Sequence, residues 1–222
     1  MNAIWAIIGR DVRLGFAGGG GASQTLIFFG LTLVLFALAV GPDQQALASI
    51  SGPVIWTSVL LAKFLSLDRV FQSDFEDGSL DLIVQRTPTL GVLVIAKATA
   101  HWLTTSALLI VFSPIAAILL NLSSDRYIAL ALSLAVGTPA LSLIGTIGAA
   151  LTFPMRRASA LTTILVGPLY APSLIFGVAA TASGQPNDIL FSPAILFLGA
   201  SSLMALVVAP LAGGMALRLN MN

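Results

Sequence analysis

The stretch Asp68-Arg-Val-Phe-Gln-Ser-Asp-Phe-Glu-Asp-Gly-Ser-Leu-Asp81 lies between two long apolar runs and carries five of the nine carboxylates of the chain. Ionised carboxylates are costly in hydrocarbon, so this segment must lie in water beside a membrane. Phe71 and Phe75 give the same segment an apolar side. The pattern predicts a solvent-facing element that docks onto a soluble partner.

The composition of the remainder is that of an integral membrane protein. Hydrophobic residues make up 57% of the 222 residues and charged residues only 9%, against roughly 25% charged in soluble domains. The mean hydropathy is +1.00. A net charge of +1 argues against a nucleic-acid binder, while zero cysteines and a single histidine exclude disulfides and multi-histidine metal sites. No catalytic residues and no metal ligands are predicted.

Six segments are long and apolar enough to span a bilayer, which takes about 20 residues each. The expected spans are Gln24–Val40, Ala46–Leu67, Thr99–Leu122, Tyr127–Leu151, Ser159–Thr181 and Pro193–Leu217. Apolar character already begins at Thr89, but Lys97 would be costly at mid-bilayer. We therefore expect residues 89–98 to lie at the interface or to form a separate short helix.

Basic residues lie almost entirely on one side of this six-span arrangement. Nine of the ten lysines and arginines fall there, and the tenth, Arg126, falls on the other side. The nine are Arg10, Arg13, Lys63, Arg69, Arg86, Lys97, Arg156, Arg157 and Arg218. Because positive charge stays inside, both termini and the acidic segment are expected to be cytoplasmic. The short loops at 41–45, 123–125 and 184–188 then face outward.

Two cytoplasmic elements complete the expected single domain of residues 1–222. Residues 1–15 carry Ile4, Trp5, Ile8 and Val12 at helical spacing, which predicts an amphipathic helix along the membrane surface. Residues 68–88 form the second element, and Pro88 ends it.

The acidic segment has the periodicity of an amphipathic helix. Leu67, Phe71, Phe75, Gly78 and Leu82 fall on one stripe, and Asp74, Asp77 and Asp81 flank it. Leu80 points away from the stripe, which indicates a break or bend at Gly78. An alternative is a helix lying in lipid, but surface helices usually carry basic residues and this one is acidic. A metal site at Asp74, Glu76, Asp77 and Asp81 does not match EF-hand spacing.

The run from Arg69 to Asp81, followed by Pro88, Ala96-Lys-Ala-Thr-Ala-His-Trp-Leu103 and Phe112-Ser-Pro114, resembles the heme exporter protein B family. That family is the B subunit of the bacterial cytochrome c maturation (Ccm) system. The resemblance implies an all-α membrane subunit of an ATP-binding-cassette transporter, similar in plan to the type 2 (ABC-2) exporters, in the bacterial inner membrane. The loop between spans two and three would hold a coupling helix, and Phe71, Asp74, Phe75, Glu76, Asp77, Gly78 and Asp81 would dock onto the ATPase.

The same resemblance implies the partners. They are a CcmA-like ATPase that binds ATP, CcmC-like and CcmD-like membrane subunits, a CcmE-like heme chaperone, and a second copy of this chain. The resemblance implies no cofactor in this chain and leaves open whether the chain moves heme itself, another substrate or no small molecule, with ATP hydrolysis coupled in the last case to release of the heme-loaded chaperone. In a heme pathway His101 invites an axial-ligand role. A histidine next to Trp102 more often anchors a helix at the interface or bonds to a neighbouring helix.

Three other functions stay open from the sequence. One is an exporter of the same architecture for another substrate, and another is a scaffold that couples the ATPase to a heme lyase without transport. The third is an intramembrane enzyme or ion-coupled carrier, which is disfavoured because no span carries a clear mid-membrane acid or catalytic pair.

Overall fold

The computed structural model describes residues 2–17, 21–155, 158–182 and 190–221. These residues form an all-α bundle with no strand among them, as predicted. Within them, six helical runs are long and apolar enough to cross a membrane. They are α2 (Gly21–Val40), α3 (Gln44–Ser66), the run Leu90–Leu119, α8 (Ser124–Thr152), α9 (Ala158–Ala182) and α10 (Pro193–Asn220). For five of them, the predicted and observed ends differ by three residues or fewer.

The third span is longer than predicted, and residues 89–98 do not form a separate element. It runs without interruption through α6 (Leu90–His101), a π-helical segment (Trp102–Ser106) and α7 (Ala107–Leu119). The prediction rested on the cost of Lys97 in lipid. In the folded chain Lys97 is buried among carboxylates of two other elements, so its charge does not need to leave the helix bundle.

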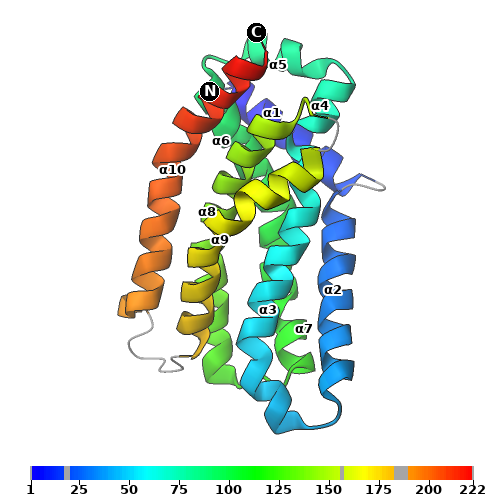
Figure 1. The fold of residues 1–222 in the computed structure, drawn as a ribbon, viewed down its shortest axis with the longest axis vertical. Helices are drawn as coiled ribbons and strands as arrows, with labels where there is room; N and C mark the ends of the chain where they lie inside the picture. Colours follow the sequence, from blue (N-terminus) through cyan, green and yellow to red (C-terminus); the bar gives the residue numbers. More distant parts are fainter. Residues whose placement is uncertain (1, 18–20, 156–157, 183–189, 222) are drawn as a thin grey trace.

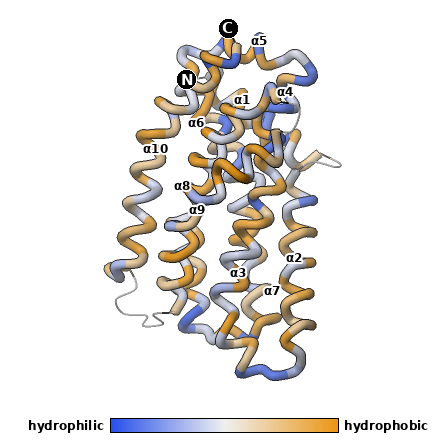
Figure 2. Tube along the Cα trace, in the orientation of Figure 1, coloured by the Kyte–Doolittle hydropathy of each residue, from blue (hydrophilic) through white to orange (hydrophobic). Residues whose placement is uncertain are grey.

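The bundle has one end rich in short helices and one end of plain turns. Helix α1 (Asn2–Phe16), α4 (Gln72–Glu76), α5 (Ser79–Arg86) and both ends of the chain gather at the same end (Figure 1). The turns from α2 to α3 and from α7 to α8 lie at the opposite end. Hydrophilic stretches occur mainly at these two ends, and the helices between them are mostly hydrophobic (Figure 2). The expected basic turn at Arg156 and Arg157 and the loop 184–188 lie outside the described residues.

Helix α8 is the central helix of the bundle. In its most apolar window 61% of the residues are buried, against 17% for α2. It packs on α9 and α10 through small residues. A side chain at Gly148 would place its Cβ 2.2 Å from Cγ2 of Val166 on α9, and the Tyr170 hydroxyl of α9 donates to the Leu141 carbonyl at 2.5 Å. Close approach of backbones is the usual basis of helix association in membranes.

Helix α1 forms over the predicted amino-terminal residues, but its apolar stripe faces protein. Ile8 is buried in a cluster with Ala96 and Ala100 of α6, and Ile4 and Val12 pack around that cluster. Trp5 points outward and is largely exposed. The helix is therefore attached to α6 along its length, and Trp5 remains available for the membrane interface.

The orientation of the bundle is testable because the chain contains no cysteine. We expect Gln44→Cys and Asp125→Cys to react with a membrane-impermeant thiol reagent added outside intact cells, since these exposed positions lie at the end opposite α4. Asp77→Cys should react only in inverted vesicles. Labelling of position 44 from the cytoplasmic side alone would contradict the six-span orientation.

Candidate functional site

The acidic segment between α3 and the third span is two short helices and not one. A 3-10 turn (Asp68–Val70) leads into α4, and Gly78, with φ of +74°, separates α4 from α5. This left-handed conformation suits glycine. The predicted break at Gly78 is confirmed, but the continuous stripe is wrong. Because the break resets the register, Leu80 is 3% exposed and Leu82 is 58% exposed.

The two phenylalanines of the segment have different surroundings. Phe71 is fully buried and lies 6.2 Å, ring centre to ring centre, from Phe153 at the end of α8. Phe75 meets the same ring edge-on at 5.2 Å but is 47% exposed. Phe71 therefore has no surface to offer a partner in this conformation, contrary to its predicted docking role. Phe75 does have such a surface.

The carboxylates divide in the same way. Glu76, Asp77 and Asp81 are exposed, whereas Asp74 is 2% exposed and points into the protein. Asp77 accepts a hydrogen bond from the Ser79 amide at 2.8 Å. Hydrogen bonds from Ser79 lower the pKa of Asp77. The predicted docking role of Asp74 thus conflicts with its burial, while the other three acids stay on the surface.

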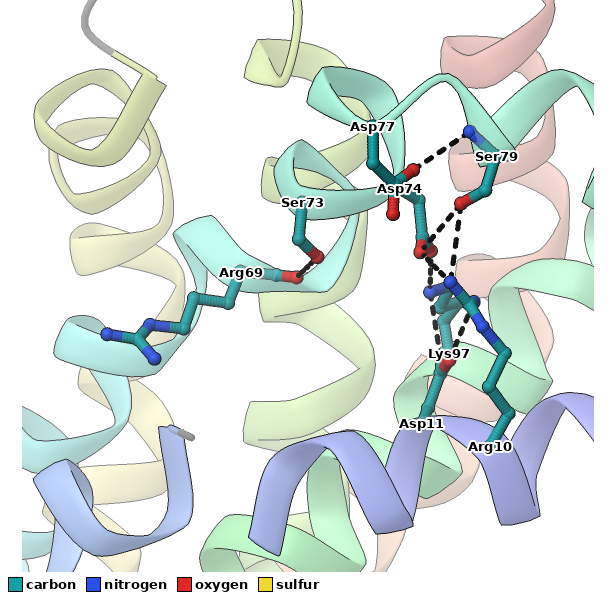
Figure 3. Close-up of polar contacts among 8 residues, drawn as sticks. All are labelled: Arg10, Asp11, Arg69, Ser73, Asp74, Asp77, Ser79 and Lys97. Carbon is teal, nitrogen blue, oxygen red and sulfur yellow. Dashed lines mark hydrogen bonds and ion pairs between the residues drawn. The ribbon is translucent and has the colours of Figure 1, made fainter. Parts of the chain in front are cut away.

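Asp74 belongs to a ring of four alternating charges, which we call the ionic latch (Figure 3). Its members are Arg10 and Asp11 of α1, Asp74 of α4 and Lys97 of α6. Arg10 lies 2.6 Å from Asp74 and 3.1 Å from Asp11. Lys97 Nζ lies 2.7 Å from Asp11 and also pairs with Asp74. Each residue contacts one of opposite charge on either side, so the ring is neutral.

Two members of the latch, Asp74 and Arg10, have pKa values shifted toward their charged forms. Burial alone would raise the pKa of Asp74, but attraction to Lys97 and hydrogen bonds from Arg10 and Lys97 outweigh it, and the pKa falls below its ordinary value. The hydrogen bond to Asp74 raises the pKa of Arg10. A depressed carboxylate pKa stabilises the folded state above the unfolded pKa, roughly 3.9, and this stabilisation is lost as the pH falls through the folded pKa.

A cavity of about 300 Å³ lies beside the latch. Arg69, Ser73 and Asp77 line it together with the latch, and Ser66, His101, Thr104 and Thr105 also line it. Its lining residues come from the acidic segment (the 3-10 turn, α4 and Asp77), from α1, α6 and the π-helical segment, and from the start of α2 and the end of α3. The cavity therefore joins the acidic segment to the middle of the third span.

His101 and Trp102 both bond to neighbouring helices, which is one of the interpretations that the sequence left open beside an interface anchor and an axial heme ligand. His101 is buried, and its Nε2 lies 2.9 Å from the Ser66 hydroxyl of α3. Its Nδ1 has no hydrogen-bond partner among the described residues. Trp102 donates from Nε1 to Thr138 of α8 at 3.0 Å. Burial excludes His101 as a membrane-interface anchor.

Lys63 is a second buried lysine. The sequence analysis counted it only as one of the nine basic residues on the cytoplasmic side. It is fully buried, and its Nζ lies 2.6 Å from Ser106, 2.7 Å from Ser142 and 3.4 Å from Thr105. Among the described residues no carboxylate forms an ion pair with it. Its position inside the expected span Ala46–Leu67 was the available signal, because an ionisable residue within a span is a functional candidate.

The described residues bring together no group of three His, Asp or Glu side chains suited to a metal ion. The four carboxylates whose spacing argued against a metal site do not lie together: Asp74 pairs with Arg10 and Lys97 in the latch, and Glu76, Asp77 and Asp81 are exposed on the surface. The arrangement favours a protein contact on the outside and a structural tie on the inside.

Comparison with known proteins gives the same full-length match throughout. The model of the family described as "CcmB protein" matches residues 2–220. "Heme exporter protein B" of Bradyrhizobium diazoefficiens is 44% identical over 218 residues, covering 98% of each chain. Proteins of the same name from Pseudomonas aeruginosa and Escherichia coli K12 are 39% and 35% identical, covering 99% of their own length and 100% and 98% of this chain.

Proposed function

Because this chain belongs to the CcmB protein family, we propose that it is the membrane subunit of a heme exporter complex that serves cytochrome c maturation. ATP hydrolysis is assigned to a CcmA-like partner, and this chain couples that hydrolysis to heme export or to release of the heme-loaded chaperone. CcmC-like, CcmD-like and CcmE-like proteins are the other partners. Two copies of the chain would face the two ATPase copies. The complex lies in the bacterial inner membrane with the acidic segment in the cytoplasm.

The proposed contact with the ATPase is supported by the exposed residues on the outer face of the acidic segment. We define the docking surface as Phe75, Glu76, Asp77, Asp81 and Leu82, all of which are exposed. A half-exposed aromatic ring beside three carboxylates is the pattern of an anchor residue with a charged rim. A partner with a basic, apolar-lined cleft would bury the ring and pair the acids.

Truncating this anchor tests the proposal. Phe75→Ala should release the ATPase subunit from membranes, since the loss of a central aromatic anchor costs about 2 kcal/mol or more, roughly a thirtyfold change in affinity. Asp77→Asn should weaken retention less, and mainly at low ionic strength, where the charge of an exposed rim residue is not screened. The measurement is recovery of the ATPase with the tagged membrane chain.

Phe71→Ala is the matched comparison. Because Phe71 is buried against Phe153, its truncation should reduce the amount of folded chain and leave the ATPase recovered per folded chain nearly unchanged. Full recovery of the ATPase with Phe75→Ala would contradict the docking surface.

Coupling without passage of heme through one chain is a second candidate function. Two cavities of the described residues favour it: about 300 Å³ beside the latch and about 100 Å³ at the opposite end near Arg126. They share no lining residue, and packed helix α8 occupies the centre between the spans. Vesicles that contain the complete complex decide between the two: ATP-dependent accumulation of heme supports transport, and chaperone release without accumulation supports coupling alone.

A further inference from the structure

We infer that Asp74 is a positioning residue that fastens the docking surface to helices α1 and α6, and that it does not contact the partner. This inference rests on the proposed function and assigns a separate task to the inner face of the same segment. Asp74 is 2% exposed, while Asp77, three positions later, is on the surface. Two aspartates of one short segment therefore serve opposite faces.

The geometry of Asp74 ties three elements together. Its Oδ1 accepts a hydrogen bond from Arg10 of α1 at 2.6 Å, and its Oδ2 accepts one from Lys97 of α6 (Figure 3). The hydroxyl of Ser79, the first residue of α5, donates to the same Oδ1 at 3.2 Å and accepts a hydrogen bond from Arg10 at 3.3 Å. The single carboxylate thus holds α4 and the start of α5 against two helices that are distant in sequence.

The latch is arranged so that no member can be lost without leaving charge behind. With all four residues the ring has two positive and two negative charges, and each is at least partly buried. Removing Asp74 leaves Arg10 and Lys97 against Asp11 alone. A buried charge without a counter-charge is strongly destabilising. We therefore expect the surrounding elements to open and admit water. Removing Asp74 and Lys97 together leaves the neutral pair Arg10–Asp11.

The helices that the latch holds lead to the buried polar groups of the bundle. Lys97 lies one helical turn before His101, and the π-helical segment with Thr105 and Ser106 follows directly. Helix α1 also reaches the π-helical segment. A Cβ at Gly15 of α1 would lie 2.6 Å from Cγ2 of Thr104, so α1 and the π-helical segment are in close contact there. Displacing the docking surface would therefore move α1 and α6 together, and π-helical turns are frequent at sites of function.

A single-cysteine reporter tests the fastening in the chain alone. The cysteine-free sequence allows Leu80→Cys, a buried position beside Ser79, to report opening of α5 through its reaction with a water-soluble maleimide. In this background Asp74→Asn should raise the reaction rate by about tenfold or more, and Asp77→Asn should leave it within about twofold. Equal rates for the two Asn variants would overturn the inference.

Charge balance separates fastening from general loss of structure. Asp74→Asn/Lys97→Met should react more slowly than Asp74→Asn, because the double variant leaves only the neutral pair Arg10–Asp11 and no uncompensated charge. If the two changes add, the ring is not one unit and the inference is wrong. Arg10→Gln is the milder variant on α1, since Arg10 is partly exposed; it should raise the rate, with the exposed Arg13→Gln as its unchanged control.

The assembled complex supplies the second readout. Asp74→Asn should retain the ATPase nearly as well as the parent chain and yet lose most cytochrome c maturation, whereas Phe75→Ala loses the ATPase itself. Loss of the ATPase with Asp74→Asn to the same extent as with Phe75→Ala would make Asp74 a contact residue and reject the inference. If Phe75→Ala keeps the ATPase, the docking proposal fails, while the maleimide rates still decide the fastening.

Discussion

Lys97→Met is expected to destabilise the protein strongly and Lys63→Met is not, although both replace a buried lysine with the same side chain. Lys97 pairs with Asp11 and Asp74, so its removal leaves two largely buried carboxylates with only Arg10. Breaking a buried ion pair by removing one partner typically costs about 3–5 kcal/mol. Lys97→Met should therefore lower the unfolding temperature strongly and expose the acidic segment.

Lys63→Met should leave the stability of the protein unchanged or raise it by about 1 kcal/mol. Only hydroxyl groups surround its Nζ, and burying an ammonium without a counter-charge is unfavourable. The lysine donates to these hydroxyl oxygens, so its removal takes away no acceptor that the hydroxyl groups use for their own O–H. A residue retained at such a cost within a span is a candidate for function, so we expect the stable Lys63→Met protein to lose heme export.

Thermal unfolding of the two variants in detergent provides the measurement. The paired design controls for the chemistry of the substitution, since only the surroundings differ. A strong loss of stability with Lys63→Met would contradict the prediction and indicate that its hydroxyl contacts hold α3, the π-helical segment and α8 together.

Gly177→Ala is expected to prevent normal packing of α9, although the change adds a single methyl group. The added Cβ would lie 2.2 Å from Cε2 of Trp56, which is fully buried and donates to Ser133 at 3.1 Å. Because the indole is rigid, fully buried and hydrogen-bonded to Ser133, we expect α9 to shift away from α3. Overpacking of this kind costs about 1–3 kcal/mol and occasionally more.

Gly167→Ala on the same helix is the matched control. Apart from its chain neighbours and the backbone of its own helix, its Cβ would lie 3.8 Å from the nearest atom, in Phe64, which is ordinary van der Waals contact. Replacing a helical glycine with alanine removes a propensity cost of about 1 kcal/mol. The yield of folded protein after detergent extraction should fall for Gly177→Ala and stay level or rise for Gly167→Ala. Equal yields would show that Trp56 has room to move.

Prediction from the sequence succeeded where a local pattern carries the structure. Runs of apolar residues located five spans to within three residues, and the misplaced Leu80 indicated the break that Gly78 makes. The His101–Trp102 pair was interpreted as an interface anchor or as a bond to a neighbouring helix, and the structure has hydrogen bonds of the second kind, to Ser66 and Thr138. Each of these conclusions depends on residues close together in the chain.

The failures share one cause: the periodicity of a helix shows which residues lie on one face but not what that face packs against. The stripe of Phe71 and Phe75 was assigned to one docking surface, but Phe153, 82 residues after Phe71, lies against both rings and buries only the first of them. Residues 89–98 were placed outside the span because a lysine is costly at mid-bilayer. The carboxylates that pair with Lys97, Asp11 and Asp74, are 86 and 23 residues away, so no local pattern pointed to them.

The sequence by itself determined the class of this protein, its six spans and the family to which it belongs. Composition and run length decide whether a chain must be in lipid, and those are properties of the chain alone. Only the tertiary structure decided which acid of the segment faces a partner and which holds α1 and α6. The free energy of a charge depends on what surrounds it, and the surroundings of Asp74 come from elements 64 and 23 residues away.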